Sequence, residues 1–398
     1  MKWGKVKVGD CCEVTSSKRI FFSEYVDSGV PFYRSKEIIE SSNGQAISEP
    51  LFISQEKYDE IKNHFGVPQP GDMLLTSVGT IGVPYIVREK DYFYFKDGNL
   101  TWFRNFSDEL DSKYLYFWVK SSEGQSVLNN TTIGSSQKAL TIASLKGLEI
   151  PCPPAPVQKR IVEILAGYDD LIENNQKQIK LLEEAAQRLY KEWFVDLRFP
   201  GHETTPIVDG VPEGWASMAM NDIAEYINGY AFKPSDWGTK GKPIIKIKEM
   251  GSGITADTPR NRGEGIPAKY IVTAGDILFS WSATLSAMIW DEEDGLLNQH
   301  LFKVIPHNGI SREFILQSIL KALDEFSNLT TGSTMKHIQR GKLKEVFVNV
   351  PDNVTMRKYE SISEPMREQI LTLKKQIILL KEARDRLLPK LMSGEIEV

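Results

Sequence analysis

Two nearly identical stretches, "KQIKLLEEAAQRL" at residues 177–189 and "KQIILLKEARDRL" at residues 375–387, decide the fold of this 398-residue chain. Nine of the thirteen aligned positions are identical, and the second stretch follows the first at an offset of 198 residues (375 − 177). Self-similarity at a fixed offset is the sequence signature of a duplicated unit. The sequence therefore predicts that one long helix occurs twice.

Three further motifs repeat in the same order along the chain. Their offsets fall from 212 to 198, so the second copy is shorter by fourteen residues (212 − 198), which we expect to be missing from loops. A period near 200 is too long for a solenoid and indicates the order domain, helix, domain, helix. The repeated pairs are "PFYRSKE" (31–37) with "PIIKIKE" (243–249), "GDMLL" (71–75) with "GDILF" (275–279), and "NTTIGSSQK" (130–138) with "NLTTGSTMK" (328–336).

Both long segments carry apolar residues at alternating steps of four and three, which is the pattern of a coiled-coil seam. We expect the two helices to pack antiparallel, with Pro365 kinking the second helix or starting its main run. Asn175 is a polar residue in the seam, and two interpretations stay open: it fixes the register, or it lies at a solvated edge. The residues expected at the interface are Ile161, Leu165, Ile172, Ile179, Leu182 and Leu189 in the first helix, and Ile370, Leu373, Ile377, Leu380 and Leu387 in the second.

The segments between the helices predict mixed α/β (α+β) domains. Stretches such as "DMLLTSVGTIGVPYIV" (72–87) are rich in β-branched and aromatic residues between turn formers, which is typical of strands. "SKYLYFWVKSSEGQSVL" (112–128) and "SREFILQSILKALDEF" (311–326) have helical spacing. The predicted organisation is a first domain at 1–155, a helix at 156–198, a second domain at 199–352 and a helix at 353–398.

Composition is that of an ordinary soluble protein, with 41% hydrophobic and 25% charged residues. No apolar run reaches the length of a membrane span, and the three cysteines are too few for a disulfide framework, so we expect a cytoplasmic protein with no membrane contact. The net charge is −5; residues 1–150 carry −2 (17 basic and 19 acidic residues) and residues 201–350 carry −3 (15 basic and 18 acidic residues). A surface for nucleic acid would therefore depend on arrangement and not on total charge.

Local signatures of catalysis are missing from the sequence. We find no phosphate-binding Gly-x-x-x-x-Gly-Lys-Ser/Thr loop, no His-Glu-x-x-His, no Gly-x-Ser-x-Gly and no Gly-x-Gly-x-x-Gly. The methyltransferase motif Asn/Asp-Pro-Pro-aromatic is also absent, and the five histidines lack the spacing of metal ligands. The expectation is no catalytic residue, no metal and no cofactor in this chain. Duplication with helical spacers favours a binding protein.

The repeated glycine-serine loops have the residues needed to hold a phosphate backbone, because small residues allow close approach and Lys adds positive charge. A polar connecting loop is the alternative interpretation, and recurrence in both copies makes the two about equal. Arg, Lys, Asn and Gln are the side chains that read base edges. The candidate DNA-binding residues are Arg34, Lys36, Ser77, Thr80, Asn99, Thr132, Gly134, Ser135, Gln137, Lys138, Lys246, Lys248, Ser280, Ser282, Asn298, Gln299, Thr330, Gly332, Ser333, Lys336 and Arg340.

With these motifs in order, the whole chain resembles the specificity subunit of type I restriction-modification systems. The residues that carry the resemblance are "VPEGW" (211–215), the two Gly-Asp strands, the two glycine-serine-lysine loops and "IPCPPAPVQKRIVEIL" (150–165). The family usually has Pro-Leu-Pro-Pro-x-x-Glu-Gln at the last motif. Here Cys152 replaces Leu and Val157 replaces Glu, while Gln158 is kept, and the second copy lacks the proline run.

The resemblance implies two target recognition domains, each reading one half of an asymmetric site in double-stranded DNA, with the helix pair fixing the spacer between the halves. It also implies two methyltransferase subunits as partners, which would bind S-adenosylmethionine, and two restriction subunits in the full complex. Two other functions stay open: a coiled-coil adaptor without DNA readout, and a self-contained DNA-modifying enzyme. A specificity subunit that lacks a nuclease partner is a third possibility.

Overall fold

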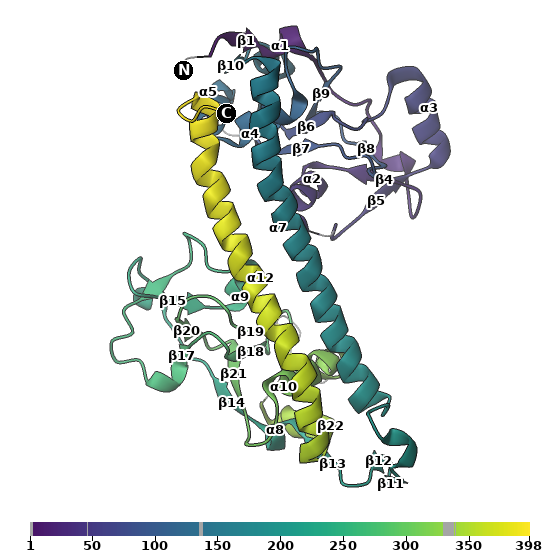
Figure 1. Cartoon of the computed structure of the whole chain (residues 1–398), viewed down its shortest axis with the longest axis vertical. Helices are drawn as coiled ribbons and strands as arrows, with labels where there is room; N and C mark the ends of the chain where they lie inside the picture. Colours follow the sequence, from purple (N-terminus) through teal and green to yellow (C-terminus); the bar gives the residue numbers. More distant parts are fainter. Residues whose placement is uncertain (1–2, 46, 135–137, 329–337, 339) are drawn as a thin grey trace. The chain divides into compact units, whose positions relative to one another are not determined.

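The structure, a computed structural model, describes residues 3–45, 47–134, 138–328, 338 and 340–398 (Figure 1). These residues form two compact units. Unit 1 comprises residues 1–176 and 376–398, and unit 2 comprises residues 177–375. Each unit therefore contains one copy of the duplicated domain and a part of both long helices.

Unit 1 contains two four-stranded sheets and a two-stranded one. The first sheet is antiparallel with the order β2-β9-β6-β7, and the second has the order β3-β5-β4-β8, in which β4 and β8 run parallel. Strand β1, near the start of the domain, pairs antiparallel with β10, its last strand. The strands are β1 (Lys5–Lys7), β2 (Glu13–Thr15), β3 (Tyr25–Val26), β4 (Val30–Tyr33), β5 (Leu51–Ile53), β6 (Met73–Thr76), β7 (Pro84–Ile86), β8 (Tyr94–Phe95), β9 (Leu100–Arg104) and β10 (Glu149–Pro151).

Unit 2 repeats this plan. The sheet β14-β21-β18-β19 matches β2-β9-β6-β7, the parallel pair β15-β20 matches β4-β8, and β13-β22 matches β1-β10. Strand β17 joins the mixed sheet beside β20, whereas β3 joins its sheet beside β5. The strands are β11 (Ile207–Val208), β12 (Val211–Pro212), β13 (Ala216–Ala219), β14 (Ala224–Asn228), β15 (Lys242–Ile245), β16 (Arg260–Asn261), β17 (Ile271–Val272), β18 (Ile277–Ser280), β19 (Ser286–Ile289), β20 (Gly295–Leu297), β21 (Leu301–Pro306) and β22 (Phe347–Val350).

Short helices also recur in both units. The stretch predicted as helical at 112–128 forms two helices, because the Ser121 hydroxyl caps the second one by accepting from the Gly124 N–H at 3.0 Å. Helix α3 has no counterpart among the described residues of unit 2, where only η5 lies between β16 and β17. The residues by which the second copy is shorter are therefore not missing from loops alone, as the sequence suggested. The helices are α1 (Val8–Cys11), η1 (Phe22–Glu24), α2 (Ser35–Ser42), α3 (Gln55–Phe65), α4 (Ser112–Lys120), α5 (Ser122–Thr131), α6 (Ile142–Lys146), η3 (His202–Thr204), α8 (Met220–Ile223), η4 (Pro234–Asp236), α9 (Ile247–Ser252), η5 (Ala268–Tyr270), α10 (Arg312–Lys321), α11 (Leu323–Asn328) and η6 (Arg340–Glu345).

The repeated Gly-Asp motif is a structural turn. Gly71 has φ +92° and its counterpart Gly275 has φ +97°, a backbone conformation that disfavours other residues. In unit 1 the Asp72 carboxylate accepts hydrogen bonds from the Gln69 N–H at 2.9 Å and from the Trp102 indole at 2.8 Å. Burial raises the pKa of Asp72.

In unit 2, Asp276 accepts from the Thr273 N–H at 2.7 Å and pairs with Lys303 at 2.9 Å. Lys303 lies opposite Leu278 as Trp102 lies opposite Leu74, so it occupies the same place. The motif thus ties the turn to the neighbouring strand in both copies.

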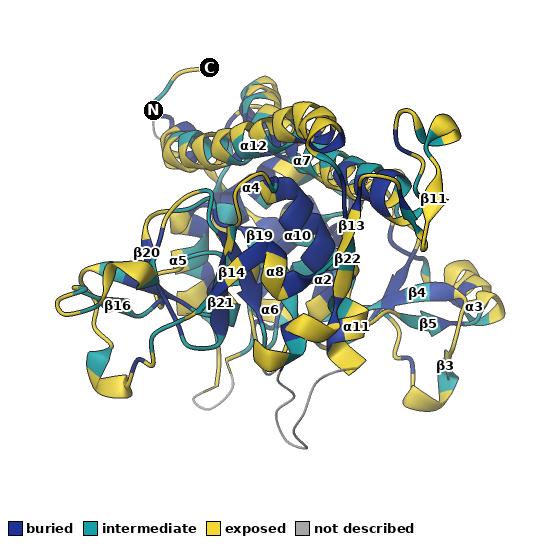
Figure 2. Ribbon diagram, turned by 90° about the horizontal axis from the view of Figure 1, so that it is seen from below, coloured by how far each residue is buried: buried dark blue, intermediate teal, exposed yellow. Residues whose placement is uncertain are grey.

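The long helices are α7 (Ala155–Tyr190), which continues as the π-helical segment η2 (Lys191–Val195), and α12 (Asn353–Ser393). Helix α12 runs through Pro365 without interruption, so the prediction that its main run starts there is wrong. It begins at Asn353 because the Asp352 carboxylate caps the Val354 and Thr355 N–H groups at 2.7 and 3.0 Å. Each helix has an exposed face (Figure 2), and none of the predicted interface residues lies on it.

In unit 1 the two helices pack antiparallel. Ile161 and Leu165 of α7 share a core cluster with Leu388 and Leu391 of α12. Further along, the Asn175 amide donates to the Gln376 side-chain oxygen at 3.1 Å. Asn175 is only 6% exposed, so it does not lie at a solvated edge, and its partner on α12 suits a residue that fixes register.

In unit 2 aromatic residues join the helices to the domain. Trp193 and Phe194, in the segment that follows α7, contact Tyr359 of α12 with ring centroids 6.1 and 4.9 Å apart. Phe194 also packs edge-on against Phe314 of α10. The predicted class, a duplicated mixed α/β domain with two long antiparallel helices, is confirmed.

Candidate nucleic-acid interface

Four segments that are far apart in the sequence converge at one edge of unit 1, where the parallel strands β4 and β8 end. Beyond β8, the Lys96 N–H donates to the Tyr33 carbonyl at 2.8 Å. The Asn99 carbonyl accepts from the Ser77 N–H at 2.8 Å and from the Ser35 hydroxyl at 3.4 Å. The loop before Leu140 joins them, because the Leu140 N–H donates to the Ser77 carbonyl at 2.9 Å.

We call this arrangement cluster 1 and define it by its predicted polar residues with solvent access, Arg34, Lys36, Thr80, Asn99, Thr132 and Lys138. All six were singled out from the sequence, and the strand topology brings their segments together. The ends of parallel strands are a common place for ligand sites in α/β proteins. The edge therefore combines positive charge, hydroxyls and an amide on one surface.

A buried carboxylate holds the most constrained cation of cluster 1. Glu37, fully buried at the first turn of α2, accepts from the Arg34 N–H at 2.7 Å and from the Arg34 Nε at 3.2 Å. The hydrogen bonds to Glu37 raise the pKa of Arg34. Arg34 is thereby fixed in orientation while its side chain keeps about a third of its surface exposed.

Unit 2 has the same convergence at the ends of β15 and β20, which we call cluster 2. The Asn298 N–H donates to the Ile245 carbonyl at 3.1 Å, and the Trp281 N–H donates to the His300 carbonyl at 3.4 Å. The Ile338 N–H donates to the Trp281 carbonyl at 2.9 Å, as Leu140 does to Ser77. The predicted residues of cluster 2 with solvent access are Lys246, Lys248 and Gln299.

The two clusters share a framework but differ in side chains. Lys246 takes the place of Arg34, and its ammonium lies 5.2 Å from the ring centre of Trp237. Glu249, the counterpart of Glu37, accepts from the Lys246 N–H at 3.1 Å and from the Thr258 hydroxyl at 3.2 Å. Lys246 is thus held through its backbone, whereas Arg34 is also held through its guanidinium.

Sequence reasoning missed His300, which lies at the centre of cluster 2. Its Nδ1 is 3.2 Å from the Ser282 hydroxyl, and its ring centroid is 5.9 Å from that of Trp281. The Trp281 indole donates to the Asn228 side chain at 3.1 Å. The only signal in the sequence was adjacency to Gln299, because the partners of His300 come from another strand.

Several predicted residues are not on the surface. Ser77, Ser280, Ser282 and Asn298 are buried, and the Ser77 hydroxyl lies 2.7 Å from that of Thr101 inside the sheet. These four buried side chains are therefore part of the framework under the clusters and are not exposed to DNA in this structure. Gly134 is exposed and has φ +94°. Ser135, Gln137, Thr330, Gly332, Ser333 and Lys336 lie outside the described residues.

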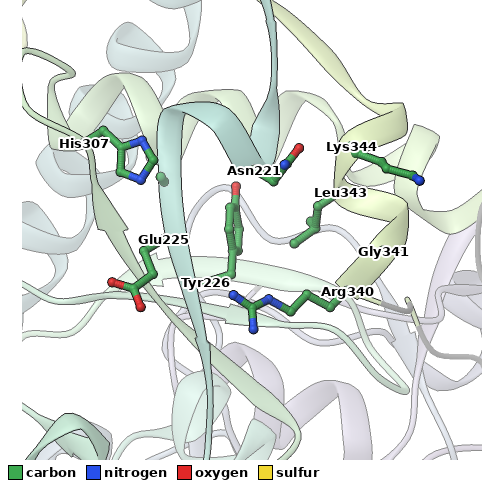
Figure 3. Close-up of a pocket in the computed structure, with 9 residues that line it drawn as sticks. Asn221, Glu225, Tyr226, His307, Arg340, Gly341, Leu343 and Lys344 are labelled. Atoms are coloured by element: carbon green, nitrogen blue, oxygen red, sulfur yellow. The ribbon is translucent and has the colours of Figure 1, made fainter.

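Arg340 lines an open pocket of about 450 Å³ in unit 2 (Figure 3). The Tyr226 hydroxyl at this pocket is buried and has no hydrogen-bond partner among the described residues, and burial raises the pKa of Tyr226. Lys344 and His307 are also lining residues. The ring of Tyr226 comes from β14, while Arg340 comes from the start of η6.

Within the part of the chain that the structure describes, no group of three or more His, Cys, Asp or Glu side chains is arranged to hold a metal ion. Among the same residues no helix has both the length and the apolar character needed to cross a bilayer.

Comparison with known proteins identifies the family. The model of the family described as "Type I restriction modification DNA specificity domain" matches residues 1–184 and 212–377. Because the two matches together cover most of the chain, the protein belongs to this family. It is a DNA-specificity subunit of the type I restriction-modification class, which acts in a complex and recognises DNA.

Particular relatives agree with this assignment. The type I restriction enzyme MjaIX specificity subunit of Methanocaldococcus jannaschii is 26% identical over 424 residues, covering 100% of this chain and 94% of the relative. A putative specificity subunit of Haemophilus influenzae, S.HindORF215P, is 29% identical over 188 residues, covering 47% and 45%. The crystal structure of the type I system S subunit from M. genitalium superposes with a TM-score of 0.59 at 15% identity, covering 98% of this chain and 96% of that one, which supports the fold.

Proposed function

We propose that this chain reads a bipartite DNA site, with cluster 1 recognising one half and cluster 2 the other. The observation that supports it is the repeated convergence of polar segments at the ends of β4-β8 and of β15-β20. In this proposal residues 1–155 and 199–352 are the recognition domains, and residues 156–198 and 353–398 are the spacers.

Different side chains at equivalent places make the two half-sites different. Arg34, braced by Glu37, has the planar fork that suits a bidentate contact to guanine. The side-chain amide of Asn99 is suited to adenine, and its backbone carbonyl is engaged in the framework. Lys246 and Gln299 are the corresponding candidates in cluster 2. The site is therefore asymmetric.

The long helices set the spacing between the halves in this proposal. Helix α7 has 36 residues, which is about 54 Å at 1.5 Å per residue. Half-sites one turn apart on DNA are separated by about 34–36 Å, which such a helix can span. The helix pair also provides the surface on which two methyltransferase subunits assemble.

Catalysis belongs to the partners in this proposal. The methyltransferase subunits bind S-adenosylmethionine and flip the adenine out of the duplex, and two restriction subunits complete the full complex. This chain itself has no catalytic residue and no cofactor. Its net charge of −5 fits such a division, because partner subunits supply part of the phosphate neutralisation.

Charge removal at the repeated loops tests the DNA role. Lys138→Ala and Lys336→Ala should each weaken DNA binding by the assembled methyltransferase complex and reduce the slope of log K against log salt by about 1. Lys146→Ala removes an exposed charge from α6, an element outside both clusters and both long helices, and serves as the control. Affinity and slope equal to those of the unmutated complex in both loop variants would remove the two lysines from the interface.

A further inference from the structure

An aromatic pair protrudes from unit 1. Phe22 is 87% exposed and Phe21 is 61% exposed, and Phe22 is the most exposed large apolar side chain among the residues that the structure describes. Neighbouring exposed apolar residues commonly mark a binding surface, whereas single ones need no explanation. We call residues 21–22 the aromatic tip.

The tip is braced from below. The Glu24 carboxylate accepts from the Phe21 N–H at 2.7 Å, and the Glu24 N–H donates to the Phe21 carbonyl at 2.9 Å. Lys57 of α3 pairs with the same carboxylate at 3.1 Å. The Phe22 ring lies edge-on to Tyr25 with centroids 5.6 Å apart, and Tyr25 packs against the buried Phe32 at 5.3 Å. The exposed rings are therefore held by η1 and are not carried by an unbraced loop.

The irregular segment before the tip is tied to cluster 1. Arg19 donates to the Asp97 carboxylate at 2.8 Å, and the Gly98 N–H donates to the Ser16 hydroxyl at 3.4 Å. Asp97 and Gly98 belong to the turn that ends in Asn99, a residue of cluster 1. The aromatic tip thus stands next to the edge at which half-site reading is proposed.

The surroundings of the tip favour nucleic acid as its partner. Lys18 and Arg19, both exposed, precede the rings by two to four residues. Arg19 is paired with Asp97 and the Lys18 ammonium lies 4.4 Å from the ring centre of Phe65, so the positive charge next to the apolar surface is that of Lys18. Aromatic faces stack on any base, and apolar side chains inserted between base steps are a recurring DNA contact. Continuity with cluster 1 points to the same duplex as the occupant.

Unit 2 shows that the two tip positions do not require aromatic residues, although the exposed Trp237 follows its equivalent turn. Its turn η4 has the same brace, because the Lys233 N–H donates to the Asp236 carboxylate at 2.7 Å. The residues at the tip positions are Lys233 and Pro234 in place of Phe21 and Phe22. The phenylalanines are therefore an addition to unit 1 on a turn that folds without them.

We propose that Phe22, supported by Phe21, is a stacking contact that inserts against bases at the border of the half-site read by cluster 1. The inference rests on the proposed function and adds a residue that recognises DNA through its bases without using their hydrogen-bonding edges. It also predicts that the two half-sites are bound differently, since only unit 1 has the tip.

The test uses the complex of the full chain with the methyltransferase subunit of its own system. The probe is a duplex that carries the methylated motif, with 2-aminopurine placed at single positions flanking the first half-site. Unstacking of a base beside 2-aminopurine raises its fluorescence. The variants are Phe22→Ala and the conservative Phe22→Trp. Phe347→Ala is the matched control, because Phe347 is 60% exposed and lies on β22 of unit 2.

Phe22→Ala should weaken binding by about five- to 150-fold, the range measured for loss of one aromatic stack on a base. The salt slope should not change, because an apolar contact releases no counterions. The fluorescence rise of the unmutated complex should disappear in Phe22→Ala and remain in Phe22→Trp and Phe347→Ala.

Unchanged affinity together with an unchanged fluorescence response in Phe22→Ala would overturn the inference. The inference would also be overturned if Phe22→Ala lost its association with the methyltransferase subunit but kept its contact with DNA, since the tip would then be a protein contact. A complex that binds DNA without sequence preference would refute the proposed function itself. That result is read from the unmutated complex and is thus distinguishable from failure of the tip alone.

Discussion

Removal of the Arg367 side chain should destabilise unit 2 strongly, because it leaves a buried carboxylate without its cation. Arg367 of α12 donates from Nε and Nη2 to one oxygen of Glu313 on α10, at 3.0 and 2.9 Å. The other oxygen accepts from Gln317 at 2.8 Å. Glu313 is 1% exposed, so water cannot replace the lost partner without rearrangement.

The expected cost of Arg367→Ala is about 3–5 kcal/mol, the range for breaking one side of a buried ion pair. The double variant Glu313→Leu/Arg367→Met removes both charges and should recover part of that loss, because an apolar pair of similar volume is often neutral in this setting, while the buried Gln317 amide loses its acceptor on Glu313. Arg160→Ala is the control, since Arg160 and Glu163 form an exposed pair on α7 and should contribute about 0–1 kcal/mol.

Urea unfolding followed by tryptophan fluorescence measures the three variants. At an m value of about 2–3 kcal/mol/M, Arg367→Ala should lower the midpoint by about 1–2 M, and Arg160→Ala should lower it by less than about 0.5 M. A loss in Arg367→Ala no larger than that in Arg160→Ala would refute the reasoning. So would a double variant that is as unstable as the single one, since the cost would then lie in packing and not in the stranded charge.

Three further predictions concern the spacer, a turn and the thiols. Deleting one heptad from each long helix should change the length of the unread spacer in the methylated motif, and an unaltered spacer would refute the proposal that the helices set this length. Gly275→Ala should lower the free energy of unfolding in urea by about 1–2 kcal/mol, because φ is +97° at this position. Gly251→Ala, with open space around it, should not lower it. Equal unfolding midpoints in the two variants would refute the claim that the Gly-Asp turn requires glycine. Burial raises the pKa of Cys11 to about 11 and of Cys12 to about 12, so neither thiol should react with iodoacetamide at pH 8 before unfolding. The partly exposed Cys152 is the one thiol open to slow labelling. Rapid labelling of two or more thiols in the native protein would contradict this prediction.

The helices were predictable because their information is periodic and local. Ile161, Leu165 and Ile370 follow the coiled-coil steps, and each is buried as the pattern requires. The partner of Asn175 was not predictable, because Gln376 is itself exposed and lies 201 residues away. A seam pattern specifies which face is buried but not which polar groups meet across it.

The candidate interface was predictable in its segments and less so in its side chains. Arg34 and Lys138 were found from repeated motifs, and the strand topology brings their segments together. Ser280 was chosen from the same kind of motif but is fully buried, because it is the last residue of β18 and faces inward. The exposure of Phe22 also escaped the sequence reasoning, since an apolar residue in a strand-rich stretch is expected to face the core.

The central claim is that two related domains each read half of one DNA site. The most direct measurement maps methylated adenines across the DNA modified by this chain and its methyltransferase partner. The account predicts one motif made of two different specified parts separated by a gap of fixed length in which any base is accepted. A single uninterrupted motif, a gap of variable length, or methylation without sequence preference would contradict it.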